Sequence, residues 1–327
     1  MTFVQKTLID DTSWEPLTGG VQNSTFLPAH LEVAATRFEN LEVELDPHSR
    51  IYWAFMKPQA QPSFTLGLLD DMREMQERIR HMFAERAAEP TQPFDYLVFA
   101  SRMPGIYNLG GDLRHFAERI RARDRASMRS YAHLCIETIW RNAHAFHVPV
   151  ITMALVQGDA LGGGFECALS YDLLVAERSA KLGLPEILFN LFPGMGAYSF
   201  LSRRMDAVRT ERMIMSGRLY TAEELYDMGV VDVLAEDGQG EAAVLEYVER
   251  HARKHNAHRA IYQARRRVNP VTREELFDVV DIWVDAALNL GEADLRKMLR
   301  LAAAQDRRLA GSTPIIRSTQ VPAMAAE

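Results

Sequence analysis

The sequence feature that most constrains the fold is a run of three glycines, Gly162–Gly164, which joins an apolar segment to a helical one. The apolar segment VPVITMALVQG (148–158) predicts a buried strand, and the residues from Phe165 onward are typical of a helix. Adjacent glycines let the backbone approach a ligand closely, and the first turn of a helix leaves amide N–H groups without partners. The junction therefore predicts a site that stabilises negative charge.

Two kinds of ligand fit such a site. A phosphate is one, but the sequence lacks the Lys-Ser/Thr pair that ends a phosphate-binding loop and the GxGxxG turn of dinucleotide sites. The other is the oxygen of a thioester as its carbonyl becomes an enolate, and this oxygen needs a further backbone N–H. The bend Gly110-Gly111, after the apolar segment 96–101, can supply it. Either bend taken alone is equally well explained as a tight turn.

Two glutamates lie near the glycine run in the sequence. Glu166 lies just inside the helix that the run begins, and Glu186 follows in the segment GLPE (183–186). A carboxylate in the first turn of a helix more often serves the helix dipole. Two carboxylates that face one substrate carbon can instead remove and donate protons, provided that their surroundings shift their pKa values. The combination with both glycine bends favours the catalytic interpretation.

The remaining pattern predicts an α/β fold in which strand-strand-helix units repeat without strict alternation, as in a spiral of small stacked sheets. A hairpin (41–57) and an amphipathic helix (64–86) come first, and nearly all residues after Ala242 are expected to be helical. Further predicted segments are helices at 124–145 and 192–205, strands at 172–177 and 180–186, and C-terminal helices at 242–256, 257–268, 272–290 and 292–309. The predicted organisation is an N-terminal extension (1–37), a catalytic core (38–241), a helical region (242–310) and a mobile tail (311–327).

Composition excludes two classes of partner. The formal net charge of the 327 residues is −7 at pH 7, so no basic surface is expected for nucleic acid. No apolar stretch approaches the ~20 residues that span a bilayer, and the N-terminus lacks the pattern of a signal peptide. We therefore expect a cytoplasmic protein without membrane insertion.

The cysteines and histidines predict no metal site. Cys135 and Cys167 fit neither a disulfide framework nor a zinc spacing, and each is expected to be a small buried side chain. His133, His144 and His147 lack a carboxylate at metal-binding spacing. The basic run Arg265–Arg267 beside Tyr262 has two interpretations, a grip for phosphopantetheine or an acidic carrier protein, or an ordinary solvated helix face.

The segment ALGGGFECALSYDLLVAERSAKLGLPEILFNLFPGMGA (160–197) resembles the signature of the crotonase, or enoyl-CoA hydratase, superfamily, and YNLGGDL (107–113) resembles its second motif. The resemblance covers roughly residues 40–240. It implies a crotonase-like spiral of ββα units, an oxyanion hole formed by the amides of Gly111 and Gly163, and acid and base roles for Glu166 and Glu186. It implies no cofactor other than the phosphopantetheine that carries the substrate. Because both carboxylates are present, hydration or dehydration is favoured over isomerisation or decarboxylation.

Two further segments, PGIYNLGGDL (104–113) and DVVDIWVDAALNL (278–290), resemble those of the diffusible signal factor synthases, the RpfF group. This closer resemblance implies that Leu109, Gly162, Trp283 and Leu301 contact the substrate, the last two lining an acyl-chain tunnel. An ordinary core aromatic is the other interpretation of Trp283.

The implied activity is dehydration of a 3-hydroxyacyl thioester on acyl carrier protein, followed by thioester hydrolysis that releases a cis-2-unsaturated fatty acid, a quorum-sensing signal. Acyl carrier protein or CoA, a sensor kinase and a second copy of the chain, commonly in a trimer, are the implied partners. An enoyl-CoA hydratase of fatty-acid breakdown is the alternative enzyme. A non-catalytic binding partner of a sensor kinase is the alternative of another class.

Overall fold

The computed structural model describes residues 27–57, 59 and 61–311. Most of the predicted N-terminal extension, and all but the first residue of the predicted tail, therefore lie outside the described residues. From the predicted extension the structure describes helix α1, Ala29–Ala35, whose Val33 is buried against the core. The buried Arg86 side chain bonds to Glu32 on α1, at 2.6 Å, and thereby ties this helix to the rest of the fold.

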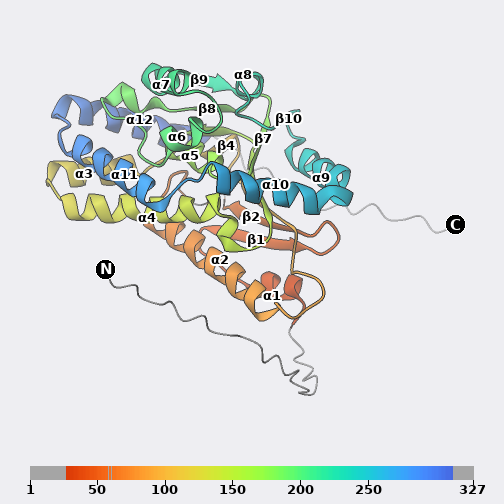
Figure 1. The fold of residues 1–327 in the computed structure, drawn as a ribbon. Coiled ribbons are helices and arrows are strands. Elements are labelled where there is room, and N and C mark those ends of the chain that lie inside the picture. The colour runs from red at the N-terminus through yellow and green to blue at the C-terminus, as the bar shows by residue number, and fades with distance from the viewer. Residues whose placement is uncertain (1–26, 58, 60, 312–327) are drawn as a thin grey trace, which may run out of the picture.

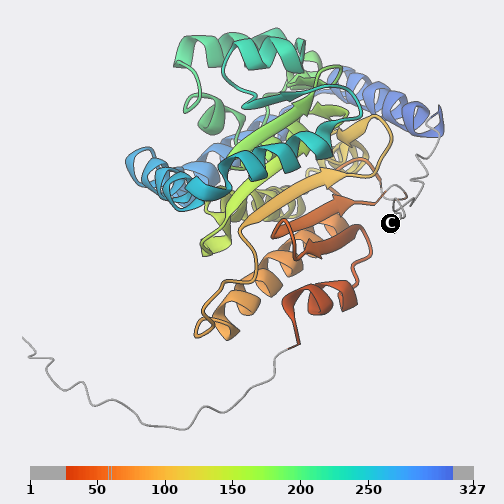
Figure 2. The ribbon, with the colours of Figure 1, turned by 90° about the vertical axis from the view of Figure 1, so that its right-hand side faces the viewer.

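A six-stranded sheet with the strand order β1-β2-β3-β5-β7-β10 forms the centre of the molecule (Figures 1 and 2). Its strands are β1 (Leu41–Asp46), β2 (Ile51–Met56), β3 (Tyr96–Ser101), β5 (Ile151–Val156), β7 (Leu173–Glu177) and β10 (Val233–Ala235). Strands β1 and β2 form the predicted antiparallel hairpin, and the other pairs are parallel. All six residues of β2 are buried, as expected for a strand with both faces covered.

A second, four-stranded sheet has the order β4-β6-β8-β9 and consists of β4 (Ile106–Asn108), β6 (Asp159–Leu161), β8 (Lys181–Gly183) and β9 (Leu219–Thr221). The chain repeats one pattern three times, because β3, β5 and β7 join the large sheet while the strand after each, β4, β6 and β8, joins the small sheet. This repetition confirms the predicted α/β spiral of ββα units.

The helices cover both faces of the large sheet. Helix α2 (Leu66–Glu85) buries the predicted apolar stripe, and α4 (Arg125–Ala143) packs beside it. On the opposite face, Val244 and Val248 of α9 (Gly240–His251) pack against the strands. The other helices are α3 (Leu113–Arg121), α5 (Gly163–Leu169), α6 (Ala197–Leu201), α7 (Ala207–Ser216), α8 (Ala222–Asp227), α10 (His255–Val268), α11 (Arg273–Leu288), α12 (Glu292–Gly311) and short 3₁₀ turns at Ala145–His147, Pro185–Phe189 and Ala252–Lys254.

The helix predicted at 192–205 is wrong in extent, because only Ala197–Leu201 is helical within it. Gly196 adopts a left-handed conformation, with φ of +99°, which begins α6 late. The amides of Met195 and Ala197 donate to the Glu166 carboxylate, at 2.7 and 2.8 Å. The Glu166 carboxylate therefore accepts the hydrogen bonds that backbone carbonyls would accept if this segment were helical.

The basic cluster Arg265–Arg267 anchors α10 to the core. Arg265 and Arg266 both contact the carboxylate of Asp172, which is only 3% exposed. The same carboxylate accepts from the backbone and hydroxyl of Thr152. The solvated helix face is therefore wrong for Arg266, which is 18% exposed, whereas Arg265 is 45% exposed although it also contacts the buried Asp172.

Helix α5 crosses β4 so closely that only glycine fits at Gly164. A β-carbon added there would lie 2.0 Å from the carbonyl oxygen of Asn108. Helix propensity alone would make Gly164→Ala stabilising by about 1 kcal/mol, whereas a clash in packed surroundings typically costs about 1–3 kcal/mol or more. We expect the clash to dominate and Gly164→Ala to lower the free energy of unfolding, measured by urea denaturation.

Gly291→Ala is the matched control for that variant, because a β-carbon there meets nothing nearer than Asp294, at 4.0 Å. Equal or greater stability of Gly164→Ala, with the control unchanged, would contradict the close crossing of α5 and β4.

Candidate active site

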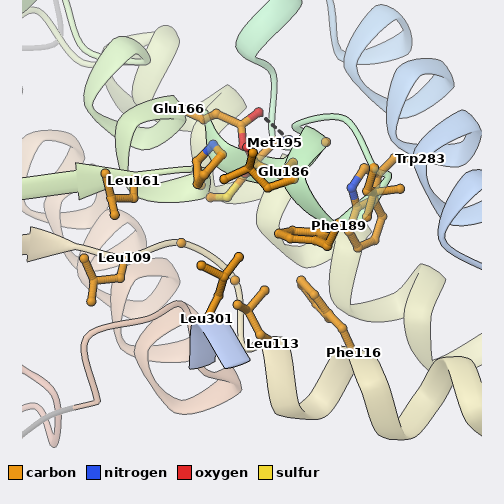
Figure 3. Close-up of a pocket in the computed structure, with 18 of the residues that line it drawn as sticks. Leu109, Leu113, Phe116, Leu161, Glu166, Glu186, Phe189, Met195, Trp283 and Leu301 are labelled. Atoms are coloured by element: carbon orange, nitrogen blue, oxygen red, sulfur yellow. Dashed lines mark hydrogen bonds between the residues drawn. The ribbon is translucent and has the colours of Figure 1, made fainter. Parts of the chain in front are cut away.

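One cavity of about 300 Å³ lies between the small sheet and the C-terminal helices (Figure 3). All eight residues predicted for the site line it, namely Leu109, Gly111, Gly162, Gly163, Glu166, Glu186, Trp283 and Leu301. In Figure 3, Glu166 and Glu186 lie on the opposite side of the cavity from Leu301 and Leu113. The fold therefore brings together residues that are up to 192 positions apart, from Leu109 to Leu301.

The two glycine bends form one wall of the cavity. They meet because β4 and β6, which precede them, are parallel neighbours in the small sheet. A β-carbon on Gly163 would lie 3.4 Å from the α-carbon of Gly110, so the two backbones are in contact. Gly110 and Gly162 have φ values of +94° and +54°, conformations that favour glycine.

The amides of Gly111 and Gly163 are available to a ligand. Within residues 27–57, 59 and 61–311, neither amide donates a hydrogen bond in a loop or helix cap. Gly163 is the first residue of α5, where a backbone N–H has no acceptor within the helix. Both residues line the cavity and their bends touch, so the two amides lie near each other at its wall.

Glu166 is 1% exposed and is held in place through one oxygen. Its Oε1 atom accepts from the amides of Met195 and Ala197. Burial raises the pKa of Glu166 well above its ordinary value, and the charge of Glu186 raises it further, while the two amides oppose both effects.

Glu186 lies on the 3₁₀ turn Pro185–Phe189, directly over Gly162. A β-carbon on Gly162 would come within 2.3 Å of its Oε1 atom, so this carboxylate occupies space that only glycine leaves open. Its Oε2 atom is buried and has no hydrogen-bond partner among the described residues. Burial raises the pKa of Glu186 to about 7.

The two glutamates titrate as a pair. Because each lies in poorly solvated surroundings and the charge of Glu186 disfavours that of Glu166, the pair holds a proton more readily than two independent carboxylates. Near neutral pH one carboxyl can therefore donate a proton while the other accepts one, which is the arrangement that acid and base chemistry at adjacent atoms requires.

The rest of the cavity is mostly apolar. Trp283 of α11 is 6% exposed and contacts the ring of Phe116, so it is both a core aromatic and part of the cavity wall. Helix α12 adds Leu301, Ala304 and Gln305. Figure 3 shows Phe116, Phe189 and Trp283 grouped at one end. These surroundings suit an aliphatic chain.

Sequence reasoning missed several contributors to the site, among them the amides of Met195 and Ala197 and the side chain of Gln305. No sequence signal marks a backbone amide as a partner of Glu166. The spacing of four residues between Leu301 and Gln305 places both on one helix face, and this was a usable signal.

The enoyl-CoA hydratase/isomerase family model matches residues 51–284, most of the chain. The chain belongs to this family. It is 31% identical over 207 residues to 2,3-dehydroadipyl-CoA hydratase of Escherichia coli K12, covering 63% of this chain and 72% of that protein. It is 32% identical over 148 residues to the mitochondrial methylglutaconyl-CoA hydratase of Rattus norvegicus, covering 45% of each. The predicted membership of the crotonase superfamily is thus confirmed, and the relatives named here are hydratases.

Solved structures of the family share the fold. A putative enoyl-CoA hydratase from Streptomyces avermitilis has a TM-score of 0.66 at 19% identity, covering 82% of this chain and 91% of that one. DspI from Pseudomonas aeruginosa has a TM-score of 0.58 at 23% identity, covering 87% of this chain and 99% of that one. At these identities the likeness concerns the fold alone.

Other expectations concern what the site lacks. Cys135 and Cys167 are buried, as predicted, and burial raises the pKa of both thiols, that of Cys167 to about 12. The described residues contain no group of three His, Cys, Asp or Glu side chains able to hold a metal ion. They also contain no helix that is both long and apolar enough to cross a membrane.

The raised pKa of Glu186 predicts a pH-dependent gain in stability for Glu186→Gln. The unfolded carboxyl loses its proton near its ordinary pKa of 4.5 and the folded one near 7, so in that window the folded state binds more protons and wild-type stability falls as pH rises. The glutamine side chain of the variant does not titrate. We expect this variant to be more stable than wild type by roughly 1–3 kcal/mol at pH 8, since each pKa unit is worth about 1.4 kcal/mol.

That difference is expected to shrink as the pH is lowered toward 4.5 in urea denaturation. Glu249→Gln, a change at an exposed position of α9, is the control and should show no such trend. A stability difference for Glu186→Gln that is independent of pH would contradict the electrostatic cause.

Proposed function

We propose that the enzyme adds water to, or removes it from, the C2–C3 bond of an acyl thioester. The observation that carries this proposal is that Glu166 and Glu186, whose pKa values are both raised, line one cavity together with Gly111 and Gly163. Membership of the hydratase/isomerase family supports it.

In the proposed reaction the thioester oxygen accepts hydrogen bonds from Gly111 and Gly163. In dehydration, one glutamate takes the C2 proton and the electron pair forms an enolate, whose charge the two amides stabilise. The C3–O bond then breaks as the other glutamate donates a proton to the departing oxygen, which leaves as water. Hydration runs the same steps in reverse. In either direction one glutamate gains a proton and the other loses one, so proton exchange returns the two glutamates to their initial protonation state.

Two observations support a substrate class, namely the apolar lining of the cavity and the activities of the hydratase relatives. An apolar cavity of about 300 Å³ lined by Trp283, Phe116 and Leu301 suits an aliphatic acyl chain. The two hydratase relatives are named for the CoA thioesters on which they act. We therefore propose a 2-enoyl-CoA or 3-hydroxyacyl-CoA as substrate, with no cofactor beyond the pantetheine carrier. This is the alternative enzyme activity considered from the sequence, and the comparisons support it better than signal synthesis.

Replacing either glutamate by alanine should abolish most of this activity. Loss of one positioned acid or base typically lowers a rate by 10²–10⁴-fold, so Glu166→Ala and Glu186→Ala should each reduce kcat for crotonyl-CoA hydration by at least about 100-fold. Loss of the enoyl absorbance measures the rate, and circular dichroism checks the fold. Arg300→Ala, at an exposed position of α12, is the control. Near-normal kcat in either glutamate variant would exclude the proposed roles.

Signal synthesis by dehydration and thioester hydrolysis, the other predicted activity, stays a second proposal. The observation that favours it is α12, whose Leu301, Ala304 and Gln305 enclose the cavity beyond the two glutamates. An acyl chain bound in this way would place its thioester carbonyl at the amides of Gly111 and Gly163. These amides would also stabilise the intermediate that forms when water attacks the carbonyl carbon. The partners implied by this activity, acyl carrier protein, a sensor kinase and a trimeric assembly, remain predictions.

Product identification separates the two activities. The purified protein is incubated with 3-hydroxydodecanoyl-CoA and with the same acyl group on acyl carrier protein, and the products are identified by mass spectrometry and chromatography against cis and trans standards. We expect trans-2-enoyl thioester, formed reversibly. Free cis-2-enoic acid, absent with Glu186→Ala, would establish signal synthesis in its place.

A further inference from the structure

The backbone around Gly111 is held by a nearly complete set of hydrogen bonds. The amide of Leu109 donates to the carbonyl of Pro62, at 2.6 Å. The amide of Gly110 donates to the Asn108 side chain, at 2.8 Å. The carbonyl of Gly110 accepts from the amide of Phe64, also at 2.8 Å. All these partners belong to the core.

A further hydrogen bond to this loop comes from the C-terminal helix. The Gln305 side chain donates its amide hydrogen to the carbonyl oxygen of Leu109, at 3.1 Å. Gln305 is 196 residues beyond Leu109 in the sequence, lines the cavity, and lies on the same helix face as Leu301.

We propose that Gln305 is a positioning residue for the oxyanion hole, because it fixes the peptide plane that precedes Gly110 and thereby the direction of the Gly111 N–H. This inference rests on the proposed thioester chemistry.

The conformation of Gly110 explains why such a fixing contact is needed. Gly110 separates the peptide plane that contains the Leu109 carbonyl from the plane that contains the Gly111 N–H. It has no side chain and a φ of +94°, so its two dihedral angles are free to vary more than those of other residues. Both planes must be held for the amide to keep one direction. Phe64 holds the second plane, while Asn108 and Gln305 hold the first.

Helix α12 is firmly attached, so Gln305 can act as a rigid support. Leu295, Met298 and Ala302 are buried on its inner face. Its first residue, Glu292, forms a bidentate ion pair with Arg121 of α3 at 2.9 and 3.0 Å. The helix also presents Leu301 to the cavity, so an acyl chain there contacts the element that supports the oxyanion hole.

Three variants test the role of Gln305. Gln305→Met keeps the length of the side chain but removes the donor, and Gln305→Lys keeps a donor of similar reach. Losing an oxyanion donor outright costs about 10²–10³ in rate. For a donor that remains but is misdirected, we expect Gln305→Met to lower kcat for crotonyl-CoA hydration about 10-fold, with KM changed less than about twofold. Gln305→Lys should retain most of kcat, and Arg300→Ala is the control on the same helix.

Hydrogen exchange supplies a readout that does not depend on activity. Peptides covering residues 108–112 should exchange faster in Gln305→Met than in wild type or Arg300→Ala, as followed by mass spectrometry. Unchanged exchange in these peptides would overturn the proposal, as would equal losses of kcat in the Met and Lys variants. If wild type turned over no acyl thioester, the proposed function would fail, and the exchange experiment would still decide whether Gln305 holds the loop.

Discussion

The contact between two glycine bends is the constraint on which the rest of the structure depends. Gly164 lies against the Asn108 carbonyl and Gly163 against Gly110, so two backbones pass each other with no room for side chains. Pairing of β4 with β6 brings the bends together, and α5 begins at the same point. The close approach leaves Gly111 and Gly163, which belong to different segments, in the lining of one cavity, and backbone amides placed in this way can stabilise a developing negative charge.

The glutamates add a second constraint. Two carboxylates placed near each other in poorly solvated surroundings destabilise the folded protein at pH values where both are charged. The protein limits this effect for Glu166 with two backbone amides from the non-helical segment and the first residue of α6. Glu186 has no such support at its Oε2 atom. The burial that raises both pKa values is thus also the cause of the stability difference expected for Glu186→Gln.

The C-terminal helices line the apolar part of the cavity and contact the wall that contains the glycine bends. Helix α11 lies beside α4 (Figure 1) and supplies Trp283, while α12 contributes to the cavity lining and reaches Leu109 through Gln305. Helix α10 is anchored separately, through the buried Asp172. The apolar part of the cavity and the wall with the two glutamates are therefore built from distant parts of the chain, and the hydrogen bond from Gln305 to Leu109 joins them.

The sequence by itself determined the elements and the chemical candidates. The alternation in residues 41–57, the stripe from Leu68 to Met82 and the glycine runs predicted the hairpin, α2 and both bends, because periodicity and glycine act locally. Only the tertiary structure decided that successive strands enter different sheets, that Arg266 pairs with Asp172, and that Gln305 meets Leu109. The reason is physical, since a local pattern fixes which face of an element is buried, whereas the partner on that face is set by the path of the whole chain.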